Sequence, residues 1–162
     1  MIYSFTIYGK SGHHLFSLEW DKAHIPGTGK KIPEDRALNL SGVLFELKTK
    51  AIRLNQPMLS DQDIEKRVKI PEPTDVLRSF TMSNYKCHYL KIGFGISFVF
   101  LTDLEVPDLH PEMERLYKEV FVPYVSMNPL HDCHERASHG SEIKNEAFKH
   151  HCEEFICKLP FF

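Results

Sequence analysis

The sequence predicts an α+β sandwich, in which a five-stranded antiparallel sheet carries helices on its faces. Five short segments have the alternating or continuous apolar pattern of strands, and three longer segments repeat apolar residues with the period of an α-helix. The segments follow the order ββ-α-βββ-α-α, and the short turns between strands favour antiparallel pairing. The length of 162 residues suits a single domain spanning residues 1–162.

The first two strands are expected to form a hairpin that leads into a long helix. Residues 2–8 and 13–20 alternate apolar and polar side chains, and the glycine-containing turn at residues 9–12 joins them. Residues 34–54 then adopt a helical period, and residues 55–75 are polar with three prolines, which predicts a flexible loop. The helix residues expected to face the sheet are Leu40, Leu44, Leu47, Ala51 and Leu54, with Val43 at the edge of the stripe.

Three further strands are predicted in the middle of the chain. Residues 76–82 and 85–91 flank a two-residue turn, as in a hairpin. Residues 96–101 follow the turn at residues 93–95 and form a continuous apolar run. Such a run is typical of a strand that is covered on both faces, so we expect it near the centre of the sheet.

Two helices are predicted to complete the fold. Asp108 is a candidate N-cap for the first, and Pro123 should kink it or end it. Ser141 is the candidate N-cap of the second. The expected apolar face of the first helix is Leu109, Met113, Leu116, Tyr117, Val120, Phe121 and Tyr124, and that of the second is Ile143, Ala147, Phe148, Cys152, Phe155 and Ile156.

The long helix carries a second apolar stripe that a single sheet face cannot bury. At about 100° per residue, Leu38, Phe45 and Ile52 lie together on one side, away from the stripe that faces the sheet. Either the helix is central and fully buried, or a partner protein covers the second stripe. Charged residues such as Lys48 and Arg53 on the same helix argue against full burial. We therefore predict that Leu38, Phe45 and Ile52 form a partner interface.

Charge, cysteine content and hydropathy exclude several classes of protein. The formal net charge is -2, so no overall basic field attracts nucleic acid, and we expect none as a partner. The four cysteines lack the spacing of a secreted disulfide framework, which favours a reducing, cytoplasmic location. The short apolar N-terminus lacks a basic region and is not expected to be a signal peptide. Without a predicted membrane span, membrane contact is expected to be peripheral.

No pattern in the sequence predicts a catalytic residue or a bound cofactor. Gly9-Lys10-Ser11 resembles the end of a P-loop, but Ser4 stands where the first glycine is needed, so we interpret it as a hairpin turn. Cys87 and His88 are neighbours on a strand, and their side chains should point to opposite faces rather than form a dyad. The His/Cys-rich segment at residues 131–139 matches no standard zinc spacing, but a metal site there stays open as an alternative.

Several sequence blocks, in one order along nearly the whole chain, carry a family resemblance. The hairpin at residues 80–89 resembles a Phe-x-Thr-x-x-Tyr-Lys-x-His-Tyr pattern of the longin-like small subunits of TRAPP (trafficking protein particle) vesicle-tethering complexes, of the subunit 1 type. The other matching blocks are Glu19-Trp20, the helix segment 41–48, Thr102-Asp103, Asn128-Pro129-Leu130 and Leu159-Pro160-Phe161-Phe162. The sequence departs from that family in the length of the 55–75 segment and in the His/Cys-rich segment.

The resemblance implies a longin/profilin-like fold and a non-catalytic adaptor role. The implied partners are other TRAPP small subunits, of the longin and α/β types, and a Rab GTPase reached through the assembled complex. Such complexes act as nucleotide-exchange factors in ER-to-Golgi transport, which implies a cytoplasmic protein peripherally associated with ER and cis-Golgi membranes. The alternatives are the small chain of a coat adaptor complex, or a metal- or thiol-dependent protein that uses the His/Cys-rich loop.

Overall fold

The computed structural model describes the chain apart from residues 11, 21–33, 56–76, 83 and 129–141. The strands are β1 (Ile2–Tyr8), β2 (His14–Glu19), β3 (Ser79–Thr81), β4 (Lys86–Lys91) and β5 (Ser97–Thr102). The helical elements are α1 (Glu34–Asn55), η1 (Gly93–Gly95), α3 (His110–Leu116), η2 (Tyr117–Ser126) and α5 (Glu146–Cys157). This order confirms the predicted fold class, while the segment predicted as a flexible loop lies almost wholly outside the described residues.

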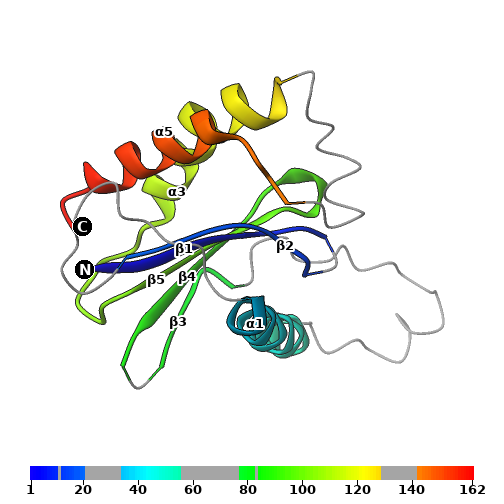
Figure 1. The fold of residues 1–162 in the computed structure, drawn as a ribbon. Helices are drawn as coiled ribbons and strands as arrows, with labels where there is room; N and C mark the ends of the chain where they lie inside the picture. The colour runs from blue at the N-terminus through cyan, green and yellow to red at the C-terminus, as the bar shows by residue number, and fades with distance from the viewer. Residues whose placement is uncertain (11, 21–33, 56–76, 83, 129–141) are drawn as a thin grey trace.

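The five strands form one antiparallel sheet in the order β2-β1-β5-β4-β3. Helix α1 lies on one face of the sheet, and α3 and α5 lie on the other (Figure 1). The central position of β5 confirms the prediction made from its apolar run. Phe98 and Phe100 are buried on the α3 and α5 face, and Val99 is buried on the α1 face, so β5 is covered on both sides.

A chain of aromatic rings connects the sheet to the helices on the α3 and α5 face. Phe98 of β5 contacts Phe121 of η2 with ring centroids 5.3 Å apart, and Phe121 contacts Phe148 of α5 at 6.0 Å. Phe148 in turn contacts Phe16 of β2 at 4.9 Å. Such edge-to-face contacts add to the free energy gained by burying the rings. This face therefore holds the large core of the molecule.

Pro123 does not end the helix in which it lies. The sequence predicted that it would either kink the helix or end it. The α-helical segment passes at Tyr117 into the π-helix η2, which contains Pro123 and continues to Ser126. At its end, the N–H of Met127 donates to the carbonyl of Val122, five residues earlier. Proline lacks an N–H and crowds the preceding turn of an α-helix. The wider π-turn gives the ring of Pro123 room, which explains why the helix continues past it.

The last helix begins later than predicted, because Asn145 and not Ser141 is its N-cap. Asn145 Oδ1 accepts the N–H of Phe148 at 3.2 Å. Ser141 lies outside the described residues, and Ile143 lies before the helix, with its N–H donating to the carbonyl of Leu15 at the edge of the sheet. Ile143 is buried as expected, but it reaches the core from the segment before α5 rather than from the helix.

Asn145 also contacts the end of the preceding helix. Its Nδ2 donates to the carbonyl of Tyr124 in η2 at 2.9 Å, while its Oδ1 caps α5. A single amide side chain thus satisfies one backbone group at the end of η2 and another at the start of α5.

Smaller differences between prediction and structure concern where the elements end and which helix residues are buried. Strand β3 is shorter than predicted, as is common for a strand at a sheet edge, which pairs on one side only. Ala147 was expected on the buried face of the last helix but is exposed. Asp108 accepts the N–H of His110 at 3.2 Å, although Leu109 occupies the cap position of α3. The ring of Phe162 packs edge-on against the ring of Trp20, with the ring centroids 5.6 Å apart.

Candidate interaction surface beside helix α1

Helix α1 contacts the sheet through one fully buried side chain. Leu44 packs into a small cluster with Tyr8, Cys87, Tyr89 and Val99. The other described residues of the predicted sheet-facing stripe, Leu40, Leu47 and Ala51, are half-buried. The prediction of the sheet-facing side is therefore correct, but the burial on this face is shallow.

Two polar contacts fix α1 over the first hairpin. Ser41 Oγ donates to the carbonyl of Gly12 at 2.9 Å, and Arg36 pairs with Glu19 at 2.8 Å. Gly12 has a φ of 78°, and a Cβ at this position would clash with the Ser41 hydroxyl. A glycine at this turn thus lets the helix approach the hairpin.

The three residues of the second apolar stripe of α1 differ in how far they are exposed. Leu38 is 51% exposed and Phe45 is 73% exposed, whereas Ile52 is half-buried. Val43, which the sequence places at the edge of the sheet-facing stripe, is 38% exposed. Within the described residues no other helix covers Leu38 and Phe45, which excludes full burial of α1 by that part of the chain.

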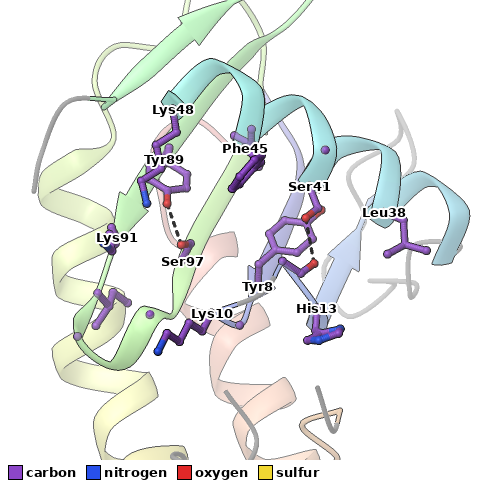
Figure 2. Close-up of a pocket in the computed structure, with 17 residues that line it drawn as sticks. Tyr8, Lys10, His13, Leu38, Ser41, Phe45, Lys48, Tyr89, Lys91 and Ser97 are labelled. Carbon is purple, nitrogen blue, oxygen red and sulfur yellow. Dashed lines mark hydrogen bonds between the residues drawn. The ribbon is translucent and has the colours of Figure 1, made fainter. Parts of the chain in front are cut away.

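A groove with a volume of ≈ 1350 Å³ runs between α1 and the turns at one end of the sheet. Phe45 lies over it in Figure 2, with Tyr8 beneath and Leu38 farther along the helix. At its floor, the hydroxyls of Tyr89 and Ser97 form a hydrogen bond of 2.9 Å. The groove therefore combines an apolar wall with a polar floor.

The charged side chains that line this groove are basic. Lys10 comes from the first hairpin, Lys91 from the end of β4 and Lys48 from α1, and His13 lies on the opposite side in Figure 2. The described lining residues include no aspartate or glutamate. The site is thus suited to a ligand that is partly apolar and partly anionic.

Sequence reasoning identified the α1 side of this site and missed the side formed by the turns. Leu38 and Phe45 followed from helical periodicity, but Lys10 and Lys91 gave no signal because they are far apart in sequence. The sheet register places them at the same end of the groove, because Tyr8 pairs with Ser97 and Ser97 pairs with Lys91. Only the strand order, with β5 between β1 and β4, could have indicated this.

Cys87 and His88 point to opposite faces of the sheet, as predicted. Cys87 is buried in the small cluster beneath α1, and burial raises the pKa of its thiol far above the ordinary value. The pKa of the Cys152 thiol is likewise raised by burial, with a further contribution from Glu153. A thiol that stays protonated is a poor nucleophile, so neither cysteine is suited to thiol chemistry.

His88 is buried on the α3 side and is held as a neutral ring. Its pKa is lowered to about 4, mainly by burial and also by the nearby positive charge of Lys86, while Asp108 acts in the opposite direction. Its Nδ1 accepts the N–H of Leu109 at 3.4 Å, and its Nε2 lies 3.1 Å from Thr102 Oγ1. These contacts fit a neutral imidazole with its proton on Nε2, which ties β4 to β5 and to the start of α3.

The metal alternative rests on residues 131–139, which lie outside the described residues. Among the residues that the structure does describe, no group of three or more His, Cys, Asp or Glu side chains is placed to hold a metal ion. None of the helices in the described ranges combines the length and the apolar character that a bilayer span requires.

Comparison with known proteins gives one consistent result. The Sybindin-like family matches residues 2–159. Trafficking protein particle complex subunit 1 of Dictyostelium discoideum is 28% identical over 162 residues, covering 100% of this chain and 99% of that protein. Transport protein particle subunit bet5 of Schizosaccharomyces pombe is 23% identical over 99% of both chains, and Trafficking protein particle complex subunit BET5 of Saccharomyces cerevisiae is 26% identical over 80% of this chain and 74% of its own. These matches confirm the resemblance inferred from the sequence blocks, and the chain belongs to the Sybindin-like family.

Proposed function

We propose that this protein is a non-catalytic subunit of a TRAPP-type vesicle-tethering complex, in which α1 binds a neighbouring subunit. The names of its relatives support the complex, since each is described as a subunit of a trafficking or transport protein particle. The single observation that supports the binding surface is the exposure of Phe45, a residue that is 73% accessible and lines the groove. A large exposed apolar side chain next to other apolar groups is a common mark of a protein interface.

In the proposed mechanism, the protein acts by positioning its neighbours and not by catalysis. The protein would hold neighbouring small subunits in register, so that the assembled complex acts on a Rab GTPase in ER-to-Golgi transport. This role requires a rigid support for the binding face, and the β sheet beneath α1 supplies one. It places the protein in the cytoplasm, with peripheral membrane contact through the complex. The buried, protonated thiols are consistent with a chain that has no chemistry of its own.

Affinity purification of the tagged full chain from its own cells tests this function. We expect other TRAPP-like small subunits to co-purify, and we expect Phe45→Asp to abolish that recovery while the variant itself stays folded by circular dichroism. Val43→Asp is the matched control, because it adds the same charge to the same helix outside the stripe. Recovery of the large chains of a coat adaptor, or of no partner at all, would contradict the proposal.

A further inference from the structure

We propose that the groove beside α1 binds an acidic segment of a partner protein, with carboxylates near Lys10 and Lys91 and apolar side chains against Phe45 and Leu38. This inference deepens the proposed function, on which it rests, because it gives the chemistry of the segment that the α1 face receives. A stable complex needs such a segment to match both the apolar wall and the charges of the groove.

The charge of the groove differs from that of the whole chain. The formal net charge is -2, yet the groove is lined by three lysines and, among its described lining residues, by no carboxylate. Lys10 and Lys91 also make no ion pair with any described residue. A local basic site on an acidic protein favours an acidic ligand over a basic one and speeds its association.

The position of Lys10 is fixed by the fold. Its side chain crosses the turn between β4 and β5 at Gly95, where an added Cβ would lie 2.8 Å from Lys10 Cβ. Gly95 has a φ of 79°, which also favours glycine. The row Tyr8, Ser97 and Lys91 crosses three neighbouring strands, so Lys91 stands about 10 Å from Tyr8 at the usual strand spacing. Two cations are thus presented at the same end of the groove (Figure 2).

The remaining surface favours a peptide rather than an acyl chain. The floor carries the paired hydroxyls of Tyr89 and Ser97, which can exchange hydrogen bonds with peptide amides. An acyl chain lying over these hydroxyls would leave their remaining hydrogen-bonding capacity unmet. Above the floor, Phe45 and Leu38 are exposed apolar side chains on one side of α1. This combination suits a segment that alternates acidic and apolar residues.

Selection from a phage-displayed library of random dodecapeptides on the purified full chain tests the inference. We expect the selected pool to be enriched in peptides that combine Asp or Glu with aromatic or aliphatic residues. By fluorescence anisotropy, a selected peptide should bind the Lys10→Glu/Lys91→Glu variant about tenfold more weakly, since two attractive charge contacts become repulsive. The Lys10→Arg/Lys91→Arg variant should bind it with nearly unchanged affinity.

The matched control is Arg53→Glu/Lys144→Glu, which makes the same change in net charge outside the groove lining and should leave binding unchanged. A selected pool without acidic residues, or equal binding to the two charge-reversed variants, would overturn the inference. So would binding to phosphatidylserine vesicles that Lys10→Glu/Lys91→Glu removes while no peptide is enriched, because the occupant would then be a lipid. The selection uses no partner subunit, so its failure is distinct from a failure of co-purification with the complex.

Discussion

The two faces of the sheet differ in how completely helices cover them. The face under α3, η2 and α5 is closed by a continuous aromatic and aliphatic core, with Phe98, Phe121 and Phe148 in direct contact. The face under α1 has a small cluster around Leu44, a groove beside it and exposed apolar side chains. The first face accounts for most of the apolar burial and hence for stability. The second leaves apolar surface available, as a binding face does.

The sharpest way to break this comparison is to remove one large side chain from each face. Phe121→Ala should lower the free energy of unfolding by about 3–5 kcal/mol, because it opens a cavity between three other rings. Leu44→Ala, the matched change on the other face, should lower it by about 2 kcal/mol, at the low end for leucine, since the shallow cluster beneath α1 can relax. Urea denaturation followed by circular dichroism measures both. Equal losses would mean that the α1 face is a full core after all.

An effect between those of the two truncations should come from His88, which is buried on the α3 and α5 face. Its pKa is about 4 in the folded protein, against about 6.5 in the unfolded chain. Between these values the unfolded state binds a proton that the folded state does not, so stability falls as the pH falls from about 6.5 to about 4. The full loss amounts to roughly 3 kcal/mol.

The His88→Gln variant isolates this contribution, because an amide can donate and accept hydrogen bonds but does not titrate in this range. The urea midpoints of the protein and the variant should converge as the pH falls through that window. Parallel pH profiles would show that His88 is protonated without penalty, and that the α3 face is less closed than its burial indicates.

The smallest expected effect on stability is that of replacing Phe45 on the α1 face. Because most of its ring is exposed, Phe45→Asp should change the free energy of unfolding of the isolated chain by no more than about 0.5 kcal/mol. The same substitution is expected to have a large effect on complex assembly. Thermal denaturation of the purified variant measures the first effect. A loss comparable to that of Leu44→Ala would assign Phe45 to the core and remove the contrast between the two faces.

Most of the fold, and part of the site, followed from the sequence. Helical periodicity separated Leu44, which is buried, from Phe45, which is exposed, because neighbouring residues of a helix lie about 100° apart. The predicted start of α5 was wrong because Ile143 has an apolar side chain in phase with the helix but lies before it, where its N–H is bonded to Leu15. The course of η2 past Pro123 could not follow from local rules that describe α-helices.

The groove itself was beyond sequence reasoning for a different reason. Lys10 and Lys91 reach the same end of the groove through the strand order and through the space left at Gly95, which are properties of the assembled sheet. The partner interface predicted at Leu38, Phe45 and Ile52 stays a prediction. Its half-buried member, Ile52, would be the least affected by a bound partner.

The double contact of Asn145 has a consequence for how the chain can vary. Because one amide contacts both the end of η2 and the start of α5, these two elements are held together by a contact that lies outside residues 129–141. Insertions or deletions within residues 129–141 should therefore leave the aromatic core intact. The length and the sequence of that connection, including its histidines and its cysteine, could therefore change in evolution while the fold stays the same.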